Sequence, residues 1–205
     1  MGTEIIGEAA YRGASHRIKL HLDGKELTLR DGLKLTIPLK DVRNVAAGDG
    51  ELTVAWAKEK ILLKVGDKAA RLADKILHPP SLLDKLGIKA GQVVSIVGLD
   101  DKSFLRDLKQ RTKAVFEGAI EANSDVILFR AVTKADLKRL KSLQKSLNRD
   151  GAIWIIRTKA PKDSKAATEM DVITAARASG LVDVKICAFS DELSAMKVVI
   201  PKANR

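Results

Sequence analysis

The sequence is poor in the residues that build disulfide scaffolds and zinc sites. It has one cysteine, Cys187, so no internal disulfide can form, and its three histidines, His16, His21 and His78, lack the spacing of zinc ligands. Cys187 stands in an apolar run, where a buried thiol is normally inert. The sequence therefore predicts no Cys-His or Ser-His-Asp catalytic centre, and the single cysteine suits a reducing cytoplasm.

Long hydrophobic runs are also missing. No stretch approaches the 18 apolar residues of a membrane-spanning helix, and the N-terminal segment carries Glu4 and Glu8 where a signal peptide would be apolar. We therefore expect no membrane insertion and a cytoplasmic, bacterial-type protein.

Aromatic residues make up only 3% of the 205 residues, whereas the formal net charge is +11. Between Lys134 and Lys165 the chain has ten cations against three carboxylates. This basic segment could contact a nucleic-acid backbone, but a lysine-rich helix face opposite a leucine stripe is also typical of solvated surface. With so few aromatics, base stacking is not expected.

Residues 1–78 are predicted to form a small antiparallel β domain with a C-terminal helix. Apolar residues alternate from Ile18 to Val65, which indicates half-buried strands, and Asp-Gly pairs at 23–24, 31–32 and 49–50 suit hairpin turns. Helical spacing follows over 69–77, with Asp67 as the expected cap and Pro79-Pro80 as the stop.

Residues 81–205 are predicted to form an α/β domain. Three buried strands are expected, with amphipathic helices between them: strands at 93–97, 126–129 and 153–156, and helices at 102–110, 134–147 and 168–179. Helices between buried strands predict a mostly parallel sheet with right-handed crossovers. The last two strands, 184–189 and 196–200, have no helix between them, so we expect an antiparallel edge.

Parts of this second domain resemble a known fold. Segments 86–94 and 147–154 resemble the lead into the first strand and the turn into the fifth strand of Rossmann-like methyltransferases. Segments 180–188 and 194–200 are similar to an uncharacterised bacterial family of that fold, a domain of unknown function. This resemblance spans residues 81–205 and implies a methyltransferase-like fold without an activity. Segment 37–42 and the final helix of the first domain resemble a pleckstrin-homology or GRAM-like module.

A working S-adenosylmethionine or dinucleotide loop needs glycines after the first strand, so that the backbone can approach the cofactor. Here Gly98 is followed by Leu99, Asp100 and Asp101, two carboxylates at a helix N-terminus where a phosphate would otherwise sit. One interpretation is that Asp101, or Ser103, simply caps the helix. The other is that Asp100 or Asp101 binds a neutral or cationic group of a cofactor.

The resemblance also implies an acidic residue at the end of the second strand that binds the cofactor's ribose. Glu117 stands at the corresponding position, although a single glutamate there is more often a solvated loop residue. The motif of amino-methylating enzymes after the fourth strand is replaced by residues 130–133, Arg-Ala-Val-Thr.

Cations follow two of the predicted strands at the carboxyl edge of the sheet, where doubly wound folds bind ligands. Arg130, Arg157 and Lys159 could converge on a carboxylate or phosphate, with Lys162 and Lys165 on the next loop. The alternative hypothesis is that Arg130 pairs with Asp100 or Asp101 and closes the cleft.

Taken together, the sequence favours a noncatalytic binding or scaffolding protein with a degenerate methyltransferase-like domain and a protein partner. No cofactor or metal is expected. Two hypotheses compete with it: an S-adenosylmethionine-dependent methyltransferase with a divergent loop using Gly98, Asp100, Asp101 and Glu117, and an anion or nucleic-acid binder using the 134–165 segment.

Overall fold

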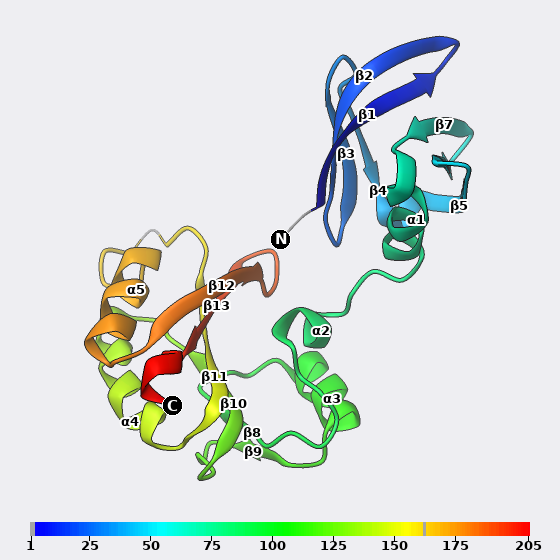
Figure 1. Ribbon diagram of the computed structural model, residues 1–205. Helices are drawn as coiled ribbons and strands as arrows, with labels where there is room; N and C mark the ends of the chain where they lie inside the picture. Colours follow the sequence, from blue (N-terminus) through cyan, green and yellow to red (C-terminus); the bar gives the residue numbers. More distant parts are fainter. Residues whose placement is uncertain (1–2, 162) are drawn as a thin grey trace. The chain divides into compact units, whose positions relative to one another are not determined.

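The computed structural model describes residues 3–161 and 163–205 (Figure 1). The chain divides into two compact units, Met1–Pro80 and Ser81–Arg205, called here the first unit and the second unit. Lys162, one of the predicted loop cations, lies outside the described residues. None of the helices in the described ranges has the length and hydropathy needed to span a bilayer.

The first unit is an antiparallel sheet of seven strands with one α-helix. The alternation of apolar residues predicted the antiparallel sheet and five of its strands, and helical spacing predicted the helix. Its elements are β1 (Thr3–Tyr11), β2 (Ala14–Leu22), β3 (Glu26–Asp31), β4 (Leu35–Pro38), the 3-10 helix η1 (Leu39–Asp41), β5 (Val42–Gly48), β6 (Glu51–Trp56), β7 (Glu59–Lys64), the 3-10 helix η2 (Gly66–Lys68) and α1 (Ala69–Leu77).

The strand order is β4-β3-β2-β1-β7-β6-β5, so the first strand lies at the centre of the sheet. It pairs with β2 along its full length and with β7 from Glu8 to Ala10. Neither β1 nor β5 was predicted. Among residues 4–11 of β1 only Ile5 and Ala9 are buried, and β5 has no buried residue, so both lack the strong apolar alternation of the other strands. Gly7 is required in β1 because a Cβ there would lie 2.5 Å from the carbonyl oxygen of Lys64.

The turns and the helix cap of the first unit differ in detail from the prediction. Asp49 and Gly50 both have positive φ, as expected, but at Asp23 the side chain instead accepts hydrogen bonds from the backbone N–H groups of Lys25 and Glu26. Helix α1 forms over the predicted residues and packs on the sheet. The predicted cap at Asp67 is wrong, because η2 runs directly into α1 and leaves no extended residue to act as cap.

The second unit is a six-stranded α/β domain. Its elements are α2 (Leu82–Leu86), β8 (Val94–Val97), α3 (Lys102–Arg111), β9 (Val115–Glu117), β10 (Ser124–Arg130), the 3-10 helix η3 (Lys134–Arg139), α4 (Leu140–Lys145), β11 (Leu147–Thr158), α5 (Glu169–Ala178), β12 (Val182–Ala188), β13 (Leu193–Val199) and the 3-10 helix η4 (Lys202–Asn204).

The strand order is β12-β13-β11-β10-β8-β9. Strands β9, β8, β10 and β11 are parallel, whereas β13 is antiparallel to β11 and β12 is antiparallel to β13. The predicted parallel sheet with an antiparallel C-terminal edge is therefore confirmed. After β8 the chain continues to β9 on one side and then to β10 on the other, which makes the β8–β10 boundary a topological switch point.

Helices cover both faces of this sheet (Figure 1). Helices α2 and α3 pack with Leu128 and Trp154 on one face, and η3, α4 and α5 pack with Ile127 and Ile153 on the other. The indole Nε1–H of Trp154 donates to the carbonyl oxygen of Leu86 at 2.9 Å and ties α2 to the sheet. The single helix predicted over 134–147 is wrong in form, since its first six residues make the tighter η3 before α4 begins.

Candidate functional site

The carboxyl ends of β8 and β10 meet at the switch point, where a doubly wound fold usually binds its ligand. Gly98, the residue after β8, has a φ of +70°, and a Cβ built on it would lie 3.5 Å from the carbonyl oxygen of Arg130. The two strand ends therefore approach closely, and a larger residue at position 98 would be strained by its backbone conformation.

Asp101 is held by the helix that follows the loop. It is the N-cap of α3, and its Oδ1 accepts a hydrogen bond from the backbone N–H of Phe104 at 3.0 Å. The capping role predicted for Asp101 is thus confirmed, and Ser103 lies inside the helix instead. Asp100 is exposed beside it.

Asp100 and Glu117 lie at one open hollow of about 610 Å³, on the outer side of α3. Glu117 ends β9, as predicted, and its Oε1 lies 2.5 Å from the Nζ of Lys109. Four cations of α3 and the turn after it line the same hollow: Lys102, Arg106, Lys109 and Lys113. The structure therefore brings two of the four predicted cofactor residues together, while Gly98 and Asp101 are not among the lining residues.

The guanidinium of Arg130 bonds to the protein around it. It donates to the carbonyl oxygens of Ala131 and Ile156 and to the Oγ1 of Thr158, each at 3.2 Å. Burial lowers the pKa of Arg130 from its usual range, partly offset by the charge of Asp136. The hypothesis that Arg130 pairs with Asp100 or Asp101 is wrong, because its donors reach carbonyl groups at the ends of β10 and β11 instead.

Arg157 is buried, with 6% of its side chain exposed. It donates to the carbonyl oxygens of Thr158 and Lys159 and forms an ion pair with Glu169 at 2.7 Å. Within the described part of the chain its Nε has no hydrogen-bond partner. Lys159 is exposed, so of the three cations predicted to bind an anion, two are bonded to the protein. Glu169 was missed by the sequence analysis, although an acid in the first turn of a helix after a basic loop is a usable signal.

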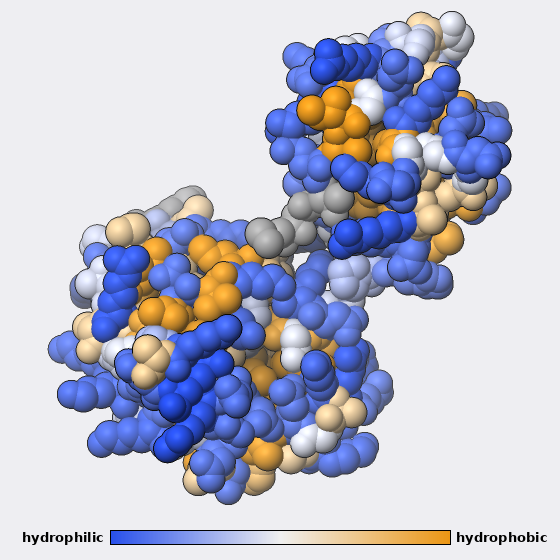
Figure 2. Space-filling view, in the orientation of Figure 1, coloured by the Kyte–Doolittle hydropathy of each residue, from blue (hydrophilic) through white to orange (hydrophobic). Residues whose placement is uncertain are grey.

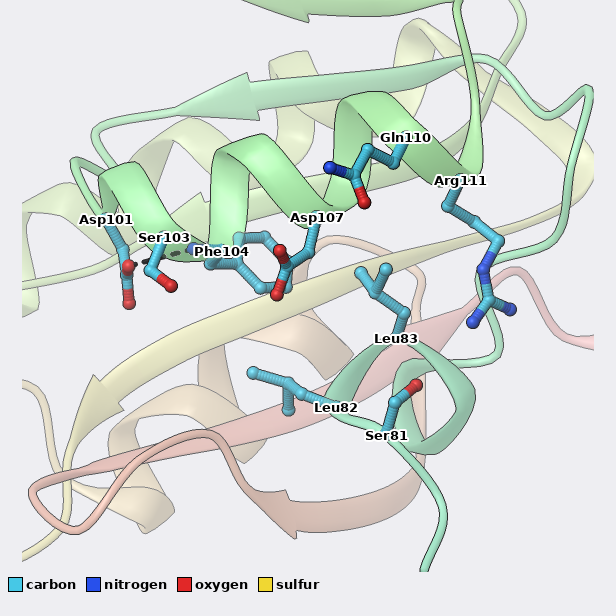
Figure 3. A pocket seen from close by; sticks show the side chains of 9 residues that line it. All are labelled: Ser81, Leu82, Leu83, Asp101, Ser103, Phe104, Asp107, Gln110 and Arg111. Carbon is cyan, nitrogen blue, oxygen red and sulfur yellow. Dashed lines mark hydrogen bonds between the residues drawn. The ribbon is translucent and has the colours of Figure 1, made fainter. Parts of the chain in front are cut away.

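A second hollow, of about 580 Å³, lies between α2 and α3 and was not predicted (Figure 3). Leu82, Leu83 and Phe104 face it from the two helices, with Asp101 and Asp107 along α3. Helix α2 itself was expected from Ser81, which forms a capping box with Asp84, and from Gly87, which is the left-handed C-cap. The space between the helices depends on their packing, which no local pattern reveals.

Apolar side chains gather on the surface over α5 and β12 (Figure 2). Four large ones in these two elements are at least 40% exposed: Met170, Val182, Val184 and Ile186. Strand β12 stands at one edge of the sheet, and a bulge between Asp183 and Lys185 interrupts its pairing with β13. Bulges are a common protection against further strand pairing at an edge.

Solved structures similar to the chain include methyltransferases. A SAM-dependent methyltransferase from Aquifex aeolicus is 15% identical, with a TM-score of 0.49, and the match covers 62% of this chain and 93% of that one. Magnesium protoporphyrin IX methyltransferase from Synechocystis PCC 6803 is 12% identical, with a TM-score of 0.45 and coverage of 58% and 78%. No curated protein matches the sequence. The family described as protein of unknown function, DUF3052, matches residues 83–202, and the chain belongs to this family.

Proposed function

We propose that this chain is a noncatalytic binding or scaffolding protein, whose second unit has a methyltransferase-like arrangement without a working cofactor loop. The main support for this proposal is the loop after β8. It has one glycine, Gly98, and its carboxylate Asp101 is engaged by the backbone of α3. The free N–H groups of a helix N-terminus are what a nucleotide phosphate would use, and here a side chain of the protein accepts from one of them.

The second strand end supports the same proposal. A ribose-binding carboxylate needs its oxygens turned to the cofactor, whereas Glu117 is paired with Lys109. Both side chains are about half exposed, so the pair adds little stability, but it competes with a ligand for the same oxygens. The residues present therefore do not fit S-adenosylmethionine well.

A protein is the partner that we propose. The exposed apolar side chains of α5 and β12 are of the kind that mark contact surfaces in soluble proteins. The few aromatic residues do not favour nucleic-acid recognition by base stacking.

One observation favours the competing methyltransferase hypothesis: Asp100 and Glu117 line the same hollow. A cofactor bound there would displace Lys109 from Glu117 and would depend on Asp100. The anion-binding hypothesis is weakened at Arg130 and Arg157, and would rest on exposed cations such as Lys138 and Lys141. It requires an affinity that falls steeply with salt and with charge reversal at those two lysines.

The test is isothermal titration of the full chain, cleared of copurified ligand, with S-adenosylmethionine and with S-adenosylhomocysteine at physiological salt. We expect no saturable heat with either. Saturable binding in the micromolar range that is lost in Asp100→Ala, but kept in the exposed control Asp183→Ala on β12, would overturn the proposal and favour the methyltransferase hypothesis instead. The same titration with duplex DNA at two salt concentrations tests the anion-binding hypothesis.

A further inference from the structure

The hollow between α2 and α3 is formed entirely by the second unit (Figure 3). One wall is Ser81 with the first turn of α2, and the other is the side of α3 that carries Phe104, Asp107 and Arg111. At about 580 Å³ it has the size of a small-molecule or side-chain site.

The base of the hollow is apolar. Phe104 and Leu83 are each 6% exposed and belong to the core cluster on this face of the sheet, and Leu82 packs against that cluster. A ligand with an apolar body would therefore bury its surface against core side chains rather than against solvated ones.

The rim of the hollow carries two carboxylates, Asp101 and Asp107, that are not paired with the lining cation. Asp101 uses only Oδ1 for a hydrogen bond within the described residues, and Asp107 is 58% exposed with a loose contact of 3.7 Å to Arg106. The one lining cation, Arg111, is paired with Asp84 at 2.9 Å and also donates to the carbonyl oxygen of Ile88. Two carboxylates are thus left facing an apolar base, in a protein of net charge +11.

The opposite side of α3 has the reverse character. Lys102, Arg106, Lys109 and Lys113 recur at intervals of four, three and four residues, which places them along one side of the helix and its continuation. An anionic ligand would therefore bind on that side of α3, and the carboxylates of the α2–α3 hollow would repel it.

We infer that the hollow between α2 and α3 binds an ammonium or guanidinium group carried on an apolar stem. The inference rests on the proposed function, since it gives the noncatalytic binding protein a ligand class. The cation lies between Asp101 and Asp107, and the stem packs on Leu82, Leu83 and Phe104. Such a group occurs on a free amine and on a basic side chain of a protein segment.

The experiment is a titration of the isotopically labelled full chain, followed by amide chemical shifts. Two cationic probes distinguish the sources: phenethylammonium stands for a free amine, and a capped phenylalanyl-arginine dipeptide for a protein segment. Phenylacetate is the anionic control with the same ring. The protein variant is Asp101→Asn with Asp107→Asn, because asparagine also caps helices well and α3 should stay intact. Asp183→Asn is the matched control outside the hollow.

We expect saturable shifts at residues 81–83 and 103–111 with at least one cationic probe, and none there with phenylacetate. Affinity should fall about fivefold or more in the double variant, the effect of two partly exposed ion pairs, and stay unchanged in Asp183→Asn. The tighter of the two cationic probes identifies the source. Failure of both probes to saturate the hollow, or equal binding of phenylacetate, would overturn the inference.

This result is separable from that for the proposed function. Binding of S-adenosylmethionine would depend on Asp100 and on the hollow that Lys102 and Lys109 line. The cationic probes report instead on residues 81–83 and 103–111, around the hollow between α2 and α3. Cofactor binding would therefore contradict the noncatalytic proposal. The chemical shifts caused by the probes would still show whether the hollow between α2 and α3 binds a cation.

Discussion

The two units differ in what they bury. Among the residues that the structure describes, every fully buried side chain of the first unit is apolar, whereas the second unit also buries polar ones: Ser95, Thr112, Ser124, Arg157 and Ser194. Ser95 and Ser124 bond to each other at 2.8 Å, and Thr112 donates to the carbonyl oxygen of Gln92. Buried polar groups need such partners, so a polar residue at the sheet edge is as easily a structural residue as a functional one.

This difference gives predictions for each unit separately, because the chain has one tryptophan in each: Trp56 and Trp154. In protein labelled with 5-fluorotryptophan, the two fluorine signals follow the unfolding of the two units in urea.

The largest effect is expected in the apolar core of the first unit. Leu63 on β7 is fully buried, and Leu63→Ala should lower the free energy of unfolding by about 3 kcal/mol, since it removes apolar contacts and leaves a cavity. The signal of Trp56 measures it. Leu62→Ala, its half-buried neighbour on the other face, is the control and should cost clearly less. Equal losses of stability in the two variants would mean that the two faces of β7 do not differ in burial.

The next effect concerns the buried cation of the second unit. Glu169→Ala removes the carboxylate partner of Arg157 and should destabilise the second unit by about 2 kcal/mol, because a buried charge is left less compensated. The signal of Trp154 measures the loss. Glu192→Ala, an exposed carboxylate in the same unit, should change stability by less than about 0.5 kcal/mol. A Glu169 variant as stable as this control would contradict a structural role for Arg157.

A smaller effect is expected at Asp101, the N-cap of α3 in the loop after β8. Asp101→Ala should cost about 1 kcal/mol, because the backbone N–H of Phe104 loses its acceptor, whereas Asp101→Asn should retain most of the stability. Urea unfolding followed at Trp154 separates the two variants. If alanine were tolerated as well as asparagine, Asp101 would not contribute to stability as the cap of α3.

The smallest effect is the dependence of stability on acid. Hydrogen bonds from the caps Ser81, Thr133 and Thr168 lower the pKa values of Asp84, Asp136 and Asp171 in the second unit. A carboxylate whose folded pKa lies below its unfolded value of about 3.9 contributes its full stabilisation above that pH and loses it as the pH falls through the folded pKa.

In the first unit Glu59 has a lowered pKa, through its hydrogen bond from Arg12, and its side chain is partly exposed to solvent. We therefore expect the second unit to lose more stability than the first between about pH 4 and about pH 2. Urea unfolding at a series of pH values measures it, and Asp136→Asn should make the loss in the second unit shallower. A steeper loss in the first unit would reverse the expected order.

Local patterns predicted most of the fold. Alternation gave five of the seven strands of the first unit, and the capping residues Ser81 and Asp101 marked the helices that they begin. The central strand β1 was not predicted, because its place depends on pairing with β7, more than fifty residues away, and on the close approach at Gly7. Its sequence alone shows little alternation.

The site was predictable only in part. The position of Glu117 at the end of a strand followed from the sequence, but its pairing with Lys109 did not. The partners of Arg130 are backbone carbonyl groups, which have no sequence signature, and Glu169 meets Arg157 across a loop. Such contacts are set by how the strand ends and loops pack in three dimensions.

The measurement that tests the account most directly is the unfolding of the second unit, followed at Trp154, with and without S-adenosylhomocysteine. A ligand of the native state present at about a hundred times its Kd stabilises that state by about 2.7 kcal/mol. With about 1 mM ligand, a Kd of about 10 µM would give that shift. We expect the urea midpoint to stay unchanged, because Asp101 and Glu117 are bonded within the protein. A shift of that size would show that the second unit binds S-adenosylhomocysteine and would contradict the account.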